Sequence, residues 1–386
     1  MNLSQLLLDQ INFNNSKISR ENVNKLLIIF QEEHRFFIGD TIMRFDRLKY
    51  LKSYYTQAQV DINFFHKEYL DEYNALIANN PNVDKTFGLS FDEIDFLSYD
   101  VIICLSYDEK GILAHLTDKY AENILTDKNP LSILSISAFF YEDPANFAFT
   151  PHYELKEYAS HVEPGELYIT SEEQQWAEAW LLSNGLKENE SLFVILDDTI
   201  DRAKLLTEKV YFEFLNDILD RQNIKVLNRD EKNAGKEEHY RKWLAPEKLE
   251  KIIFSKDTLT LRQILCIIAC RYTKFVFGPC TGIMHCSSSI YNNLVNKGLT
   301  ISDVPLMITY TGKDFKKDLM AKYWWGTSPL VTCLVLARRN GQIKPIPLNE
   351  LKDKERNRSC KIPANKYTCE MLTDFIAERQ LLQFNS

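Results

Sequence analysis

The sequence predicts an α/β protein built from two doubly wound domains whose strands end at a shared central cleft. Three observations lead to this prediction. Short apolar runs alternate with amphipathic stretches of helical length. The chain has 386 residues, which is longer than a domain with a single compact core usually is. The alternation is interrupted once and then restarts, and we place the domains at 1–165 and 166–386.

The first domain contains four apolar runs that predict strands, separated by three helical stretches. The predicted strands are 25–30, 58–64, 99–105 and 132–138, and the predicted helices are 41–55, 66–79 and 111–124. A polar and aromatic stretch, 141–166, then breaks the pattern with three prolines and a glycine. This break favours a junction between domains.

The second domain opens with a helix predicted over 170–186. Thr170 or Ser171 can cap it, Glu172 and Glu173 suit the positive end of its dipole, and Gly185 can close it. The predicted strands that follow are 192–196, 223–227, 251–254, 274–277 and 305–310, and the predicted helices are 207–221, 259–271 and 282–295.

Composition excludes several classes of protein. Hydrophobic residues make up 45% and charged residues 26%, which is typical of a globular protein. A net charge of −8 argues against a nucleic-acid binder. The eight cysteines form no CxxC pair, and neither a signal peptide nor a membrane-spanning run is present, so we expect a reduced, cytoplasmic protein. The basic run 352–366 predicts a solvated surface, with peripheral contact at the inner face of a membrane as the minority interpretation.

Three loops follow predicted strands and can carry chemistry. The first contains Asp40, just before the helical stretch 41–55. A carboxylate at the mouth of a cleft can accept a proton from an attacking hydroxyl. The structural alternative is that Asp40 only caps the helix.

The second loop, LDDTIDRAKLL at 196–206, contains Lys204. Its ammonium group can neutralise a diphosphate, although most lysines in such loops are simply solvated. Asp197, Asp198 and Asp201 lie in the same loop, but acids clustered in a polar loop more often face solvent, and we predict no metal site.

The third loop lies in KFVFGPCTGIMHCSSSI, residues 274–290. A strand that runs into a helix start at Thr281 and Gly282 directs backbone N–H groups and a positive helix dipole toward one point, which suits phosphate. His285 falls in the first turn of that helix and is a secondary candidate. We do not expect Cys280 to act as a nucleophile, because no histidine–acid arrangement is evident nearby.

The order of these elements resembles the family 9, heptosyltransferase-like glycosyltransferases over nearly all of residues 25–345. GDTIMRFDRLKYLKSYYTQAQVDI (39–62) resembles the family's Gly-Asp loop, first helix and second strand, and YDVIICLSYDEKGILAHL (99–116) its middle strand and helix. DTLTLRQILCIIACRYTKFVFGPCTGIMHCSSSI (257–290) is similar to the family's donor-binding region. MITYTGKDFKKDLMAKYWWG (307–326) is similar to the strand and loop that follow it.

The resemblance implies a GT-B fold, in which two Rossmann-like domains bind the acceptor and the nucleotide sugar respectively. It places the catalytic base on Asp40, the phosphate-contacting lysine on Lys204, and the donor-binding turn on Thr281 and Gly282, followed by His285. Two departures are clear: Asp197-Asp198 stands where the family has Pro-Gly, and Cys280 where it has Asp.

The activity implied is an inverting, metal-independent transfer from a nucleotide-diphosphate sugar to a cell-envelope or lipid-linked glycan. No cofactor is implied, because the nucleotide sugar is a co-substrate. One alternative is a catalytically degenerate GT-B scaffold that binds a glycan or a protein partner, as the two departures would allow. A weaker alternative is another GT-B enzyme, such as a sugar-nucleotide epimerase.

Overall fold

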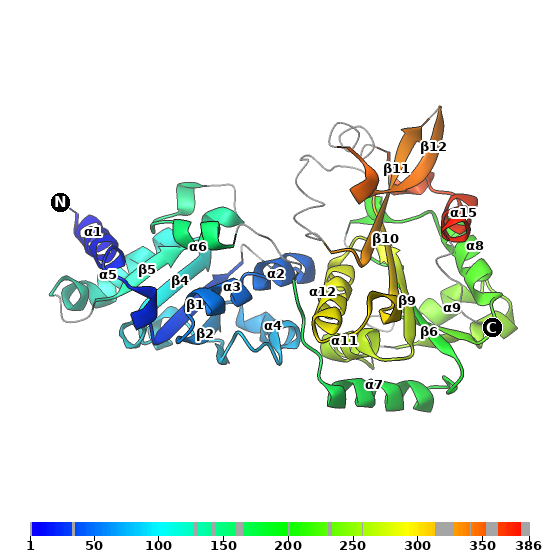
Figure 1. Ribbon diagram of the computed structural model, residues 1–386, viewed down its shortest axis with the longest axis horizontal. Helices are drawn as coiled ribbons and strands as arrows, with labels where there is room; N and C mark the ends of the chain where they lie inside the picture. The colour runs from blue at the N-terminus through cyan, green and yellow to red at the C-terminus, as the bar shows by residue number, and fades with distance from the viewer. Residues whose placement is uncertain are drawn as a thin grey trace. The chain divides into compact units, whose positions relative to one another are not determined.

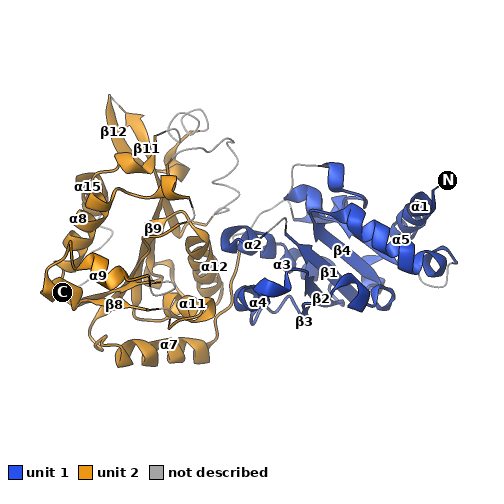
Figure 2. Cartoon of the chain, turned by 180° about the vertical axis from the view of Figure 1, so that it is seen from behind, with its two compact units in different colours: residues 1–162 blue, residues 163–386 orange. Residues whose placement is uncertain are grey.

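The computed structural model describes residues 2–32, 35–126, 130–140, 144–159, 165–199, 201–230, 234–256, 258–312, 328–339, 341–352 and 362–379. The chain divides into two compact units, Met1–Val162 and Glu163–Ser386, which Figure 2 shows in blue and orange. Each unit contains its own sheet. Most of the basic run 352–366 and of the predicted loop after 312 lies outside the described residues.

Unit 1 is a five-stranded parallel sheet with the order β3-β2-β1-β4-β5 (Figure 1). Its strands are β1 (Lys25–Gln31), β2 (Gln59–Phe64), β3 (Lys85–Phe87), β4 (Val101–Ser106) and β5 (Ser132–Ser135). Its helices are α1 (Leu3–Asn15), α2 (Ile38–Phe45), α3 (Leu48–Tyr54), α4 (Leu70–Ile77), α5 (Glu109–Leu125) and α6 (Tyr153–Tyr158).

Both faces of this sheet are covered, which explains why its central strands are continuous apolar runs. Along β1, alternate side chains point to opposite faces. Leu27 and Ile29 pack in one cluster with residues of α1 and α5. Phe30, on the other face, contacts Phe45 of α2 and Tyr73 of α4. The unit is therefore doubly wound.

Unit 2 is a seven-stranded sheet with the order β12-β11-β10-β9-β6-β7-β8, parallel except for the antiparallel edge strand β12. Its strands are β6 (Ser191–Ile195), β7 (Ile224–Asn228), β8 (Ile252–Phe254), β9 (Thr273–Pro279), β10 (Leu306–Tyr310), β11 (Val331–Arg339) and β12 (Gln342–Pro347). Its helices are α7 (Ser171–Ser183), α8 (Glu208–Leu219), α9 (Lys236–Tyr240), α10 (Pro246–Leu249), α11 (Leu261–Ala269), α12 (Gly282–Asn296) and α15 (Cys369–Glu378).

The faces of the second sheet are covered in the same manner. Phe275 and Phe277 of β9 join one buried cluster with residues of α8 and α15. Helices α11 and α12 lie on the other side of the strands in Figure 1. Helix α7 starts with a capping box between Thr170 and Glu173, and Gly185 follows its end with φ +92°, as the sequence predicts.

The predicted fold class is confirmed, and the differences are local. The single helix predicted over 41–55 is wrong: the helical segment starts earlier, at Ile38, and is interrupted at Asp46 and Arg47 between α2 and α3. The strand predicted over 132–138 ends at Ser135, because a 3₁₀ turn begins at Ser137. Within the described residues, no helix has the length and apolar character needed to cross a membrane.

Candidate functional site

Glu32 organises the end of β1 in unit 1. The side chain lies directly after the strand and is 2% exposed. Its carboxylate accepts hydrogen bonds from Thr41 Oγ1 (3.0 Å), from Tyr73 OH (3.0 Å) and from the Arg44 guanidinium. Burial raises the pKa of Glu32, whereas the charge of Arg44 lowers it. Glu32 thus attaches α2 to the sheet, because two of its three side-chain donors belong to that helix.

Asp40 lies in the first turn of α2 and its side chain is exposed. The helix begins at Ile38 and its N-cap position is Phe37, so Asp40 does not cap the helix. This excludes the structural alternative considered from the sequence. Thr41 and Arg44, which Glu32 holds, fix the turn that carries Asp40 at the carboxyl end of β1.

In unit 2 the two neighbouring strands β6 and β9 carry the remaining predicted residues. Ile195 pairs with Phe277, and the Leu196 N–H donates to the Phe277 carbonyl oxygen (2.8 Å). A Cβ on Gly278 would lie 2.7 Å from Leu196 Cβ and 3.1 Å from the Leu196 carbonyl oxygen. Only glycine allows the loops after the two strands to leave the sheet in such close contact.

The helix start predicted after β9 is present. Thr281 occupies the N-cap position of α12 but makes no side-chain capping bond. The first bond within the helix runs from the His285 N–H to the Thr281 carbonyl oxygen (3.2 Å), so the N–H groups of Gly282, Ile283 and Met284 have no partner inside the helix. Thr281 and Gly282 are half-buried, and a phosphate placed there would meet the positive end of a fifteen-residue helix.

Cys280 directly precedes the N-cap of α12, and His285 lies in the first turn of the helix. Both are buried, and Cys280 Sγ lies 4.0 Å from His285 Nε2. Burial raises the pKa of Cys280 to about 12, so the thiol stays neutral. The charge of Lys204 acts in the opposite direction. Lys204 ends a 3₁₀ turn, Arg202–Lys204, whose start Asp201 caps through the Ala203 N–H.

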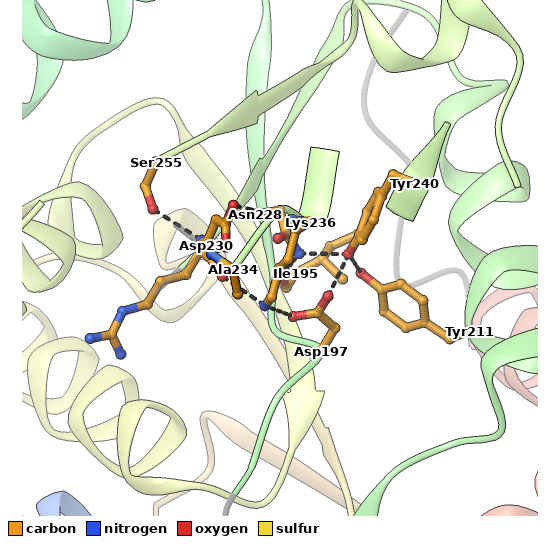
Figure 3. A network of polar contacts seen from close by, with 10 residues as sticks. Ile195, Asp197, Tyr211, Asn228, Asp230, Ala234, Lys236, Tyr240 and Ser255 are labelled. Carbon is orange, nitrogen blue, oxygen red and sulfur yellow. Dashed lines mark hydrogen bonds and ion pairs between the residues drawn. The ribbon is translucent and has the colours of Figure 1, made fainter. Parts of the chain in front are cut away.

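Asp197 lies in a network that the sequence did not reveal (Figure 3). Its Oδ1 accepts from Lys236 Nζ (2.5 Å) and its Oδ2 from Tyr240 OH (2.6 Å). Tyr240 OH also contacts Tyr211 OH (2.6 Å) and accepts from Asn228 Nδ2 (2.7 Å). Asp197 is therefore paired with a cation and held by hydrogen bonds, whereas Asp198 is exposed.

The start of α9 positions Lys236 for this role. Asp230, which is 1% exposed, accepts from the backbone N–H groups of Ala234 (2.8 Å) and Lys236 (3.2 Å). Lys236 Nζ donates in addition to the Arg229 carbonyl oxygen (2.8 Å). The pairing spans 39 residues of sequence, so no local motif could have indicated it.

The structure thus brings Cys280, Thr281, Gly282 and His285 together after β9, and it places Lys204 in the loop that follows the neighbouring strand β6. Asp40 occupies the corresponding carboxyl end of β1 in unit 1. Among the described residues, no group of three or more His, Cys, Asp or Glu side chains could hold a metal ion.

Two mostly parallel sheets, each covered by helices on both faces and each with its candidate residues after strand carboxyl ends, are typical of GT-B proteins. Solved structures with this fold include heptosyltransferase II of E. coli, which is 14% identical with a TM-score of 0.56 over 92% of this chain and 99% of that one. A family 9 glycosyltransferase of Veillonella parvula is 13% identical, with a TM-score of 0.55 over 82% of this chain and 87% of that one.

The E. coli heptosyltransferase WaaC, solved with ADP, is 14% identical, with a TM-score of 0.52 over 92% of this chain and 99% of that one. No protein-family model and no curated protein matches the sequence. The chain therefore has the fold of the heptosyltransferase-like family 9 glycosyltransferases, and the GT-B prediction is confirmed.

Proposed function

We propose that this protein is an inverting glycosyltransferase that uses a nucleotide-diphosphate sugar. The observation that carries the proposal is the uncapped start of α12 after β9, with Lys204 in the loop that follows the neighbouring strand β6. A lysine and a row of backbone N–H groups together provide the positive charge and the donors that a diphosphate requires. The fold supports the same assignment, because WaaC was solved with ADP.

In the proposed reaction, Asp40 accepts the proton of an acceptor hydroxyl as its oxygen attacks the anomeric carbon. The new C–O bond forms on one face of the sugar while the bond to the diphosphate oxygen breaks on the other, which inverts the configuration. The leaving nucleoside diphosphate keeps the electron pair, and Lys204 with the N–H groups after Thr281 stabilises its charge. The residues named here perform these steps without a metal ion. The acceptor we propose is a cell-envelope or lipid-linked glycan.

Donor binding is tested by calorimetry with ADP-, GDP-, UDP- and CMP-sugars. We expect saturable binding of one of them and about 10–100-fold weaker binding in Lys204→Ala, because a charge-assisted bond contributes about 1.5–3 kcal/mol. Lys209→Ala is the matched control, since that lysine is 76% exposed on α8. Absence of binding across the panel would instead favour the non-catalytic scaffold.

Catalysis is tested with Asp40→Asn. We expect kcat to fall by about 10²–10⁴-fold with little change in donor affinity, because an oriented general base contributes a factor of that size. Asp71→Asn is the control, since Asp71 is also an exposed acid in the first turn of a helix in unit 1. Turnover in Asp40→Asn equal to that of the unmodified protein would remove Asp40 from the role of base.

A further inference from the structure

A cavity of about 550 Å³ opens in unit 1, and Asp40 is not among its lining residues. Its walls come from the end of α1, the segment Ser19–Glu21, the end of α3 and the segment Thr150–Glu154. The volume lies within the roughly 300–1,000 Å³ that small-molecule sites occupy. The cavity is therefore large enough for a small organic ligand.

The cavity lies near the amino ends of β1 and β2 and beside the edge strand β5. Arg20 and Glu21 precede β1, and Tyr55 precedes β2, so these residues lie toward the amino ends. Pro151 forms a bridge with Ser135, the last residue of the edge strand β5, on the side of the sheet away from β2 and β3. Asp40 follows the opposite end of β1, a strand whose seven residues span roughly 20 Å. The cavity is thus separate from the candidate catalytic residue of the same unit.

The hydrogen bonds of His152 determine whether the buried hydroxyl of Tyr55 has an acceptor for its proton. His152 is 4% exposed, and its Nδ1 accepts from the Leu155 N–H (3.3 Å) at the start of α6. Burial lowers the pKa of His152 to about 4, so the ring is neutral and carries its one proton on Nε2. Nε2 therefore donates to Tyr55 OH (2.8 Å).

Tyr55 then has a proton to donate. Its side chain is 1% exposed and lines the cavity. Its hydroxyl oxygen accepts a hydrogen bond from His152 Nε2. Among the described residues, no acceptor lies within hydrogen-bond distance of the hydroxyl proton. A buried donor left without an acceptor costs about 1–3 kcal/mol. An oxygen of a bound ligand would satisfy it.

The rest of the lining is mostly polar, with exposed aromatic surface from Tyr153, and its charged residues are Arg20, Glu21 and Glu154. Tyr153 is 66% exposed, which is unusual for a large ring, and it lines the cavity. Arg20 pairs with Glu21 (3.1 Å), and Glu154 accepts a hydrogen bond from Tyr54 OH. These charged groups leave no surplus positive charge for an anion. A neutral molecule with hydroxyl groups and an apolar face fits this combination better.

We propose that this cavity is a second saccharide site, which binds a neutral pyranoside separately from the donor and the catalytic base. A sugar oxygen accepts the hydrogen bond from Tyr55 OH, and a C–H face of the ring lies on Tyr153. The inference does not rest on the proposed transferase activity, because a scaffold without activity would bind the same ligand.

The test is saturation-transfer NMR on the full-length protein with methyl pyranosides of glucose, galactose, mannose and N-acetylglucosamine. We expect transfer to ring C–H protons of at least one glycoside. Its affinity should fall about five- to tenfold in Tyr55→Phe, which loses one hydrogen bond, and about tenfold in Tyr153→Ala. Tyr120→Phe is the control, because its hydroxyl donates to the Ile94 carbonyl oxygen outside the cavity.

Independence from the donor site is tested in the same samples. Saturating ADP, inorganic phosphate and the Lys204→Ala substitution should all leave the glycoside signal unchanged. Displacement by ADP would assign the signal to the donor site and overturn the proposal. So would the absence of a signal from every glycoside, or unchanged affinity in Tyr55→Phe and Tyr153→Ala variants that unfold at the temperature of the unmodified protein.

Discussion

Replacing Lys236 with methionine should destabilise unit 2. The substitution removes the ammonium group that lies 2.5 Å from Asp197 Oδ1 and keeps most of the aliphatic chain. The side chains of Lys236 and Asp197 are 19% and 14% exposed, so water can only partly replace the lost partner. Lys236→Met also removes the bond to the Arg229 carbonyl oxygen.

The magnitude follows from this partial burial. Removing one partner of a fully buried ion pair costs about 3–5 kcal/mol, whereas an exposed pair contributes about 0–1 kcal/mol. Tyr240 OH still donates to Asp197 Oδ2, which retains part of the stabilisation of the carboxylate. We therefore expect a loss of about 2–3 kcal/mol, equivalent to a fall in Tm of about 5–10 °C for a domain of this size.

Tryptophan fluorescence isolates this effect, because all five tryptophans lie between residues 176 and 325, within unit 2. Thermal unfolding is compared with that of Arg241→Met, which removes a 63% exposed partner of Glu237 and should lower Tm by no more than about 2 °C. If Lys236→Met lowers Tm no more than Arg241→Met does, Lys236 does not neutralise Asp197 and the reasoning is refuted.

Two further predictions concern close packing and pH. Gly278→Ala should destabilise unit 2 by about 1–3 kcal/mol, because its Cβ would lie 2.7 Å from Leu196 Cβ; an unchanged tryptophan transition would show that β6 can move aside. Burial lowers the pKa of His152 from 6.5 to about 4 in the folded protein. As the pH falls below 6.5, the unfolded chain therefore binds a proton on this histidine before the folded chain does. The stability that is present above pH 6.5 is lost as the pH falls toward 4. Between pH 7 and pH 4.5, urea titrations should show a loss about 2–3 kcal/mol larger than in His152→Gln, and equal losses would contradict the depressed pKa.

The sequence predicted most of the buried strands because buried parallel strands are continuous apolar runs, but it missed β11, which lies inside the second sheet. Two edge strands, β3 and β12, lack that signal. β3 has only three residues, with the exposed Lys85, and β12 contains Pro345 and Pro347, which are typical of an edge. Nothing in the amphipathic pattern of 41–55 marked the interruption at Asp46. The hydrophobic periodicity therefore could not predict the boundary between α2 and α3.

The sequence could predict those parts of the candidate site in which a residue's role depends only on its neighbours in sequence. The uncapped start of α12 follows from a strand, a Gly-Pro turn and small residues, all adjacent in sequence. The roles of Glu32 and Lys236 depend on partners 9–12 and 39 residues away, respectively. Such pairs form only after the strands have brought their ends together, so a single sequence gives no sign of them.

The two departures from the family pattern bear on the proposed activity through their charge. An acid at 197 and another at 198 would oppose a diphosphate if both were free, since like charges repel strongly where water is partly excluded. Asp197 is paired with Lys236, and the thiol of Cys280 is neutral, so the exposed Asp198 is the one additional negative charge that these departures contribute. Lys204 and the start of α12 offset a single charge more readily than two, which supports a donor site in unit 2. If Lys236→Met also weakens donor binding, the released charge of Asp197 accounts for the loss, and the network in Figure 3 serves the donor site as well as the fold.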